Sequence, residues 1–157
     1  MPPQLLFPVE KLDPDRVVIP MEEVRKVNRQ RYEMEQLNGI LYFSPEEGIA
    51  VGIKNVSPNE FWVRGHIPGR PLLPGVLMCE CAAQVCSFYY GRTVGTDRFL
   101  GFGGLHEVKF RGPVTPGDRL IMIVKCVEVR SRLAQFRTQG VVNGRLVFEG
   151  TVIGVPM

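Results

Sequence analysis

Residues 64–84 read Arg64-Gly-His-Ile-Pro-Gly-Arg-Pro-Leu-Leu-Pro-Gly-Val-Leu-Met-Cys-Glu-Cys-Ala-Ala-Gln84, and this stretch changes character half-way along. Its first twelve residues contain three prolines and three glycines, which excludes a regular element and predicts a stiff, tightly turned loop. Pro74 can stand at the start of a helix, because proline loses no needed hydrogen bond there. The apolar run that follows has no helix breaker before Gly91. We therefore expect a long helix from Gly75 or Val76, buried all round.

Two polar residues interrupt this apolar run. Glu80 and Gln84 are four residues apart and so share one face of the expected helix. A buried carboxylate is costly without a partner. Glu80 is therefore either a structural group, satisfied by Gln84 or a nearby backbone amide, or a catalytic acid. In the second case the apolar helix would raise the pKa of Glu80, and Gln84 would hold its rotamer.

His66 lies in the Gly/Pro-rich loop just upstream and favours the catalytic interpretation. Imidazole and carboxyl groups often work together as general base and general acid. The helix N-terminus behind Pro74 also offers free backbone N–H groups, from Gly75 onward, and the positive end of the helix dipole. Such a site can stabilise a developing oxyanion. The stretch therefore predicts a base, an acid and an oxyanion site close together in the sequence.

Residues 65–84 resemble the signature of bacterial 3-hydroxyacyl-[acyl carrier protein] dehydratases, roughly G-H-F-P-x-x-P-x-x-P-G-V-L-x-x-E-x-x-A-Q. Ile67 replaces the usual Phe. The block from Val108 to Leu120 is similar to the later F-R-x-P-V-x-P-G-D-x-L segment of this family. Two ordered blocks form a specific signal, and the resemblance covers the chain from about Tyr32 to its end. The matching residues of the first block are His66, Pro68, Pro71, Pro74, Gly75, Val76, Leu77, Glu80, Ala83 and Gln84.

The resemblance implies the hotdog fold, in which an antiparallel sheet wraps around one long central helix. It implies homodimers that pair edge to edge, with His66 of one subunit facing Glu80 of the other; a trimer of such dimers is a further option. The implied reaction is the reversible loss of water from a 3-hydroxyacyl thioester on acyl carrier protein or coenzyme A, giving a trans-2-enoyl thioester.

The resemblance also implies a role for each residue of the site. His66 would remove the proton beside the carbonyl, and the Gly75 N–H would bind the thioester oxygen. Glu80 would protonate the departing hydroxyl, and Gln84 would orient Glu80. This chemistry requires no metal and no redox cofactor, and we expect none.

The rest of the chain predicts an α+β domain with one helix packed on a sheet. Residues 21–28 have helical content, and the chain before about Pro20 is a proline-rich lead-in that could pack over the domain. The dipeptide Asn143-Gly144 is a strong hairpin signal. We expect a single hotdog domain over residues 1–157, with about the first 30 residues as its lead-in. Five or six mostly antiparallel strands are expected within residues 39–43, 48–56, 99–110, 120–129, 133–142 and 146–155.

Composition excludes several other classes of protein. Hydrophobic residues make up 45% of the chain and charged residues 22%, as in ordinary globular domains. No apolar run is long enough to span a bilayer, and the N-terminus lacks the features of a secretory signal. We therefore expect a cytoplasmic protein. The formal net charge of +3 is too small to indicate nucleic-acid binding.

The four cysteines predict neither a zinc site nor a disulfide framework. Cys79, Cys81 and Cys86 crowd the expected helix, Cys126 stands alone, and no second cluster completes a set of zinc ligands. They are best interpreted as small buried hydrophobic residues in a reducing compartment.

The sequence departs from the family between residues 30 and 39, where relatives usually read H-R-Y-P-F-L-L-V-D-R. The usual apolar middle is polar here at Glu35 and Gln36, which leaves the acyl chain undefined and is compatible with a specialised substrate. Arg64 and Arg70 flank the signature, and we expect them to contact a carrier protein or its phosphopantetheine.

Two alternative functions use the same fold. One is a hotdog acyl thioesterase, which needs a carboxylate that activates water. The other is a non-catalytic acyl-binding or assembly subunit. Fold alone does not decide among these classes. The presence of both His66 and Glu80 favours dehydration.

Overall fold

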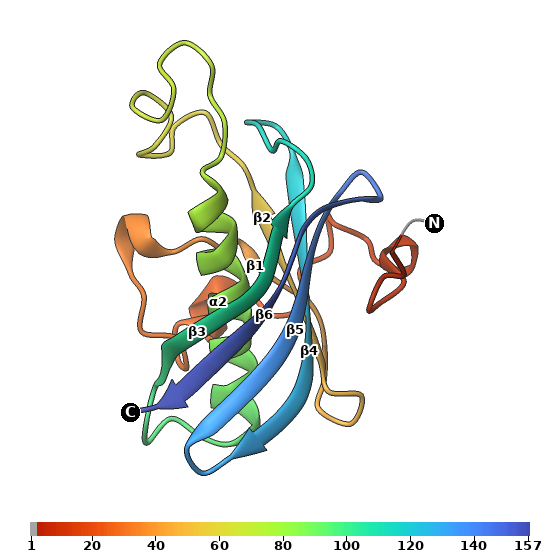
Figure 1. Ribbon diagram of the computed structural model, residues 1–157, viewed down its shortest axis with the longest axis vertical. Helices are drawn as coiled ribbons and strands as arrows, with labels where there is room; N and C mark the ends of the chain where they lie inside the picture. The colour runs from red at the N-terminus through yellow and green to blue at the C-terminus, as the bar shows by residue number, and fades with distance from the viewer. Residues whose placement is uncertain (1–2) are drawn as a thin grey trace.

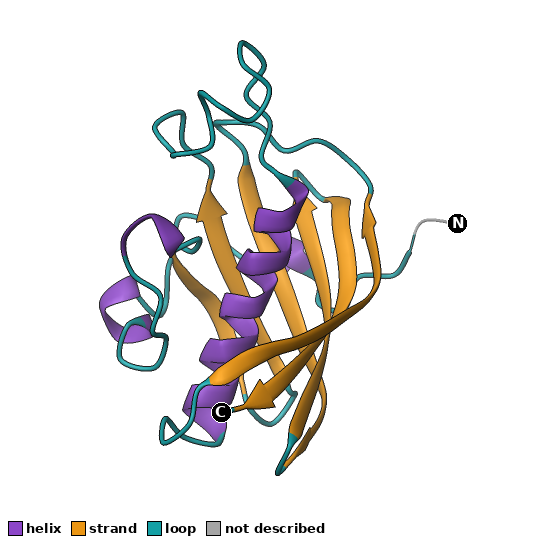
Figure 2. Cartoon of the chain, turned by 60° about the vertical axis from the view of Figure 1, so that its left-hand side comes forward, coloured by secondary structure: helices purple, strands orange, loops and turns teal. Residues whose placement is uncertain are grey.

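The computed structural model describes residues 3–157, in which six strands form one antiparallel sheet around the long helix α2 (Gly75–Thr93) (Figure 1). The strands are β1 (Gly39–Ser44), β2 (Ile49–Asn55), β3 (Leu100–Phe110), β4 (Arg119–Arg130), β5 (Leu133–Val142) and β6 (Arg145–Pro156). Their order across the sheet is β1-β2-β4-β5-β6-β3, so β1 and β3 are the two edges. Figure 2 shows α2 running along one face of the curved sheet, which confirms the expected α+β hotdog fold.

The main core lies between α2 and the sheet. Phe88 of α2 is fully buried, and its ring meets that of Phe43 edge-on with 5.3 Å between the centroids. Phe136 of β5 and Phe148 of β6 belong to the same cluster and are also fully buried. Because each of these aromatic side chains removes a large apolar area from water, this interface strongly stabilises the position of the helix.

The predicted helix begins at Gly75 as expected, but two details of the prediction are wrong. Gly91 does not end the helix, which continues to Thr93. A Cβ on Gly91 would lie 2.8 Å from the Cβ of Val27, so glycine is needed here for close packing. The helix is also not buried all round, because Val76 is 72% exposed and both Glu80 and Ala83 are only partly buried. Their spacing places these three residues on one face.

Among residues 3–157, no helix is long and apolar enough to cross a membrane.

The strand predictions are confirmed, with bounds that differ from the observed ones by at most one residue. Asn143 and Gly144 both have positive φ, at 50° and 76°, as a two-residue hairpin turn requires. The helix expected over residues 21–28 is shorter, because α1 covers only Met21–Val24. The chain then turns, and the Asn28 side chain donates a hydrogen bond to the Gln84 carbonyl of α2 at 2.9 Å.

The lead-in packs over the outer face of the sheet. It contains the short 3-10 helix η1 (Val9–Lys11) and contributes Leu6, Phe7 and Leu12 to a second apolar cluster. The Phe7 ring contacts that of Tyr42 with 4.5 Å between the centroids. The lead-in therefore covers apolar residues that the sheet would otherwise expose on this side. The buried members of this cluster are Ile49, Val51, Ile123 and Val141.

Candidate active site

The N-terminus of α2 opens onto a cavity of about 620 Å³. Pro74 is the N-cap, and Gly75 is the first helical residue, so the backbone N–H groups of Gly75 and Val76 have no partner within the helix. A Cβ on Gly75 would lie 2.8 Å from Cε1 of Phe110, so only glycine accommodates the ring in this position. Gly75, Val76 and Phe110 all line the cavity. An anionic oxygen placed here would meet free N–H donors and the positive end of the helix dipole.

Glu80 and Gln84 lie one turn apart on α2 and are joined as the sequence predicted. Gln84 Nε2 donates a hydrogen bond to Glu80 Oε1 at 2.9 Å. Burial raises the pKa of Glu80 above its ordinary value, and the bond from Gln84 lowers it to a smaller extent. Glu80 therefore holds its proton at a higher pH than an exposed glutamate would.

The orientation of the Gln84 amide is determined by two backbone groups. Its Nε2 also donates to the Met34 carbonyl at 2.6 Å, and its Oε1 accepts from the Gln36 N–H at 2.9 Å. The reverse orientation would place like groups against each other at both ends. Glu80 Oε1 therefore accepts a hydrogen bond, and Oε2 is the oxygen free to carry the proton.

Glu80 also lines a smaller cavity of about 180 Å³ between α2 and the edge of the sheet. Ala83 and Cys86 follow Glu80 along this side of the helix, and Phe102 of β3 lies across from them. The walls are largely apolar, which explains the desolvation of the Glu80 carboxyl.

His66 lies in the loop before α2 and is held by two hydrogen bonds. Its Nδ1 is 2.6 Å from the Leu72 carbonyl oxygen, and its backbone N–H donates to the Trp62 carbonyl at 2.8 Å. Because a carbonyl oxygen only accepts, Nδ1 carries the hydrogen, and Nε2 of the neutral ring keeps a free lone pair. The next residue, Ile67, has a φ of 68°, a strained value for a β-branched side chain. Such strain is typical of functional sites.

Comparisons with known proteins agree on the family. Residues 28–152 match the FabA-like domain family. A 3-hydroxyacyl-[acyl-carrier-protein] dehydratase FabZ from Klebsiella pneumoniae subsp. pneumoniae is 36% identical over 143 residues, which cover 88% of this chain and 93% of the relative. The chain belongs to the 3-hydroxyacyl-[acyl-carrier-protein] dehydratase family.

Solved structures show how widely the dehydratase fold is shared. The dehydratase heterocomplex ApeI:P from Xenorhabdus doucetiae has a TM-score of 0.72 at 15% identity, with 85% of this chain and 90% of that chain covered. A hypothetical thioesterase with coenzyme A from Streptococcus pneumoniae TIGR4 has a TM-score of 0.61 at 12% identity, with 87% and 96% covered. Both show the fold alone, so the fold does not separate dehydratases from thioesterases.

Of the residues predicted from the dehydratase signature, the structure joins Glu80 and Gln84, whereas Gly75 lines a different cavity from Glu80. Gly75, Glu80 and Gln84 lie on the first three turns of α2. Within the described chain, His66 shares neither a hydrogen bond nor a cavity with Glu80. Arg64 and Arg70 are exposed on the same loop as His66, and neither forms an ion pair with a residue among 3–157.

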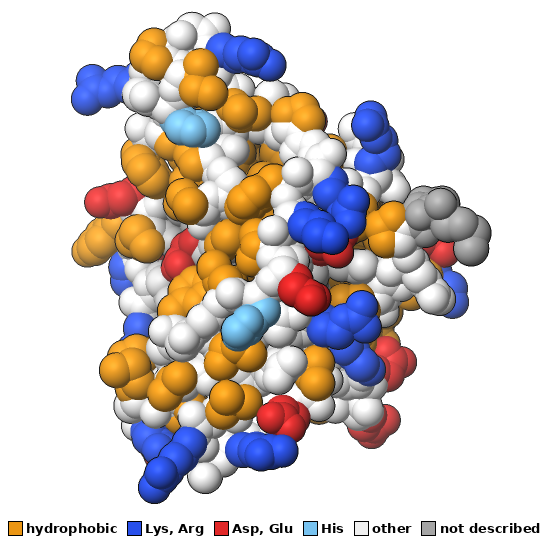
Figure 3. Space-filling view, viewed as in Figure 1, with side chains coloured by type: hydrophobic (Ala, Val, Ile, Leu, Met, Phe, Trp, Pro, Cys, Tyr) orange, Lys and Arg blue, Asp and Glu red, His pale blue; other side chains and the backbone are white. Residues whose placement is uncertain are grey.

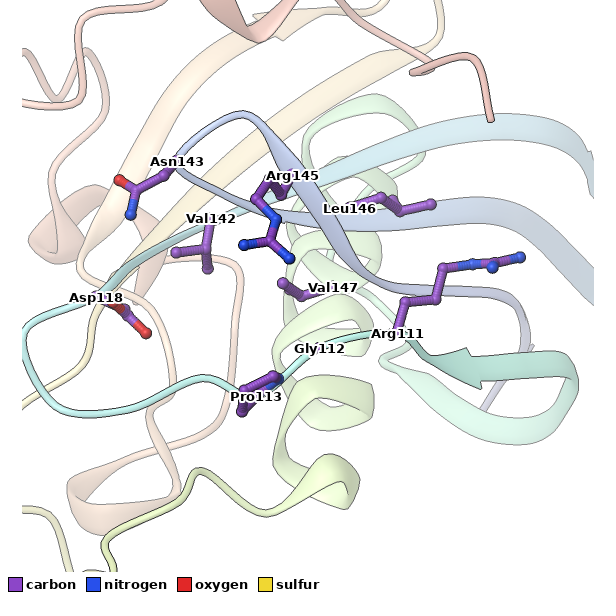
Figure 4. A pocket seen from close by; sticks show the side chains of 9 residues that line it. All are labelled: Arg111, Gly112, Pro113, Asp118, Val142, Asn143, Arg145, Leu146 and Val147. Atoms are coloured by element: carbon purple, nitrogen blue, oxygen red, sulfur yellow. The ribbon is translucent and has the colours of Figure 1, made fainter. Parts of the chain in front are cut away.

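A pocket of about 250 Å³ lies beside the Gly75 cavity and shares Arg111, Gly112 and Pro113 with it (Figure 4). The Arg145 side chain projects toward the space between the β5–β6 hairpin and Pro113, whereas Arg111 points away and pairs with Glu149. None of the predicted site residues lines this pocket. The candidate active site of this dehydratase-family chain therefore remains at the start of α2.

Sequence reasoning missed a buried ion pair behind the site. Lys54 of β2 is 4% exposed, and its Nζ lies 2.5 Å from Glu60 Oε1 and 3.1 Å from Gln36 Oε1. Glu60 Oε1 also accepts a hydrogen bond from Trp62 Nε1 at 3.1 Å. The signal in the sequence was the one charged residue in a largely apolar strand, because such a charge needs a buried partner.

Proposed function

We propose that this protein catalyses the reversible dehydration of a 3-hydroxyacyl thioester on acyl carrier protein, as a hydro-lyase of fatty-acid or related acyl-chain biosynthesis. The family and the 36% identity to a dehydratase over most of the chain support this reaction. The observation that carries it is the Glu80–Gln84 pair beside the Gly75 turn, together with a loop histidine whose Nε2 is free. A thioesterase requires no such combination of base and protonated acid.

In the proposed mechanism, Nε2 of neutral His66 takes the proton from the carbon beside the thioester carbonyl. The electron pair moves toward the thioester oxygen, which the Gly75 N–H stabilises. As the double bond forms, Glu80 Oε2 donates its proton to the hydroxyl, which leaves as water. Gln84 keeps Glu80 Oε1 occupied, so the proton is presented from Oε2. His66 ends protonated and Glu80 ionised, and proton exchange with solvent resets both groups.

We further propose that the active sites form between the two subunits of a homodimer. Among residues 3–157, no strand pairs with the outer side of edge strand β3, and Phe102, Leu105 and Phe110 on it are exposed. Hydrophobic side chains run along this face of the molecule, on which both histidines are visible (Figure 3). Pairing two β3 edges would cover this strip and satisfy the unpaired backbone groups. It would also supply each Glu80 with the partner's base, as the family resemblance implies.

The first test is hydration of a trans-2-enoyl thioester, followed by the loss of its ultraviolet absorbance. We expect activity in the wild type and a loss of about 100-fold or more in His66→Ala and in Glu80→Gln. Acyl-carrier-protein and coenzyme A thioesters of several lengths would be compared. Release of free thiol by the wild type would instead indicate a thioesterase. An intact thioester in every sample would indicate a binding or assembly subunit.

The proposal that both subunits contribute to each active site has its own test. In a mixed dimer, the two substitutions can be placed in different chains. A heterodimer of His66→Ala and Glu80→Gln, isolated with two affinity tags, contains one intact site if His66 and Glu80 come from different chains. We expect about half of the wild-type activity from it, although each parent dimer is inactive. An inactive heterodimer would show that each chain builds its site alone.

We propose that Arg64 and Arg70 receive the acidic face of the carrier protein or its phosphopantetheine, since both are exposed beside His66. Charge reversal at both positions should reduce turnover of the carrier-bound substrate. It should affect less the turnover of a short thioester that carries neither a carrier protein nor coenzyme A. Unchanged turnover of the carrier-bound substrate would refute this contact. We place the activity in the cytoplasm, where the four cysteines would keep the free thiols seen in the structure.

A further inference from the structure

A hydrogen-bonded network lies behind Glu80 and extends across three elements of the fold. It starts at Gln84, whose amide contacts the backbone of residues 34–36 at both ends. This segment begins at Met34, the last residue of the 3-10 helix η2 (Tyr32–Met34), and Gln36 precedes Gln84 by 48 residues in the sequence. The orientation of the Gln84 amide therefore depends on where this segment is held.

The Gln36 side chain holds the segment in place. It is 2% exposed, and its Nε2 donates to the Glu33 carbonyl at 3.0 Å. Its Oε1 accepts from Lys54 Nζ at 3.1 Å, which connects the segment to strand β2. A hydrogen bond to a buried cation is stronger than one between neutral groups, so this contact restricts the segment more than the others do.

The cation itself has a fixed position. Lys54 pairs with Glu60, and Glu60 Oε2 accepts a hydrogen bond from the Ser57 N–H at 2.8 Å. Glu60 also accepts from Trp62, whose carbonyl receives the His66 N–H. The anchor of the segment is therefore the base of the loop that carries His66.

The Gln84 side chain bonds to the backbone N–H of Gln36 and not to the Gln36 side chain. A leucine would still offer its backbone N–H to Gln84, but it would give Lys54 no acceptor. The polar side chain is thus unnecessary for the bond to Gln84 itself. What it adds is a rigid link between that backbone and a buried charge.

We propose that Gln36, held by Lys54, is a positioning residue that keeps the Gln84 amide, and through it the Glu80 carboxyl, in the orientation needed for proton donation. The inference rests on the proposed dehydratase function. A misplacement of the acid affects the chemical step more than substrate binding, because the proton moves only in the transition state. A role limited to stability would leave the turnover of the folded enzyme unchanged.

The test compares Gln36→Leu with a matched control, Gln139→Leu. Gln139 is 5% exposed, and its side chain likewise makes two hydrogen bonds, to Leu6 and Gln4, but on the outer face of the sheet. We expect Gln36→Leu to lower kcat for hydration about ten-fold with KM within about two-fold of the wild type. Gln139→Leu should keep kcat. Circular dichroism and thermal unfolding would verify that both variants are folded. If Gln36→Leu did not fold, Gln36→Met would be used in its place.

A double-mutant cycle shows whether Gln36 acts through Glu80. In the Glu80→Gln background, Gln36→Leu should cause no further loss of the residual activity, because the acid that it positions is gone. An unchanged kcat in folded Gln36→Leu, or an equal loss in both backgrounds, would overturn the positioning role. A wild type without hydration activity would instead contradict the proposed function, so the two failures are distinguishable.

Discussion

Removing the buried cation at Lys54 should destabilise the protein strongly. In Lys54→Met, a side chain of similar length replaces one that is 5% exposed and 2.5 Å from Glu60. The Glu60 side chain is 17% exposed, so its charge would be left largely desolvated and without a counter-charge. Breaking such a buried pair from one side typically costs about 3–5 kcal/mol. At about 2–4 °C per kcal/mol for a chain of this size, Tm should fall by about 6–20 °C.

A surface pair provides the matched control. Lys26 and Glu23 are 2.8 Å apart, but their side chains are 69% and 42% exposed. Lys26→Met should therefore cost at most about 1 kcal/mol. The double variant Lys54→Met/Glu60→Gln removes both buried charges and should recover part of the lost stability, because no unpaired charge remains. The recovery is incomplete because the amide has one acceptor oxygen, whereas Ser57 and Trp62 donate to different oxygens of Glu60.

Thermal and urea unfolding measure these differences directly. Trp62 is the only tryptophan in the sequence, is 3% exposed and is bonded to Glu60, so its fluorescence reports on this part of the structure. All variants would be compared at one protein concentration, since any dimer makes Tm depend on it. If Lys54→Met lost no more stability than Lys26→Met, the Lys54–Glu60 pair would be screened like a surface pair, and the reasoning from its burial would be wrong.

Two further predictions concern α2. Burial raises the pKa of Glu80, so the wild type should lose stability as pH rises from about 4.5 through the raised pKa, whereas Glu80→Gln has no proton to lose there. The Tm of Glu80→Gln should therefore rise relative to that of the wild type between pH 4 and pH 8. Parallel plots of Tm against pH for the two proteins would contradict the raised pKa of Glu80. Gly91→Ala should lower the stability by about 1–3 kcal/mol, because the added Cβ would lie 2.8 Å from Val27. Alanine has the better helix propensity, so a higher Tm would show that Val27 moves aside at little cost.

Part of the candidate site could be predicted because its residues are neighbours in the sequence. The i, i+4 spacing of Glu80 and Gln84 determines that they meet on any helix, and Pro74 followed by Gly75 marks where that helix begins. The same local logic located the hairpin at Asn143-Gly144 and every strand. These features depend on backbone preferences and on hydrophobic periodicity, which act over a few residues.

Contacts between distant segments could not be predicted in this way. In the sequence, Gln36 is notable only as a polar residue in a segment expected to be apolar. The strand pattern around Lys54 gives no indication of its partner. Their meeting beside Gln84 depends on how η2, β2 and α2 pack. The role of Gly91 also depends on a distant residue. Its sequence context predicts the end of the helix, but in the structure it lies within the helix and packs against Val27. Local periodicity thus determined the elements and placed Glu80 beside Gln84 on α2. Only the tertiary structure decided which buried polar groups satisfy one another, because that depends on burial and on long-range partners.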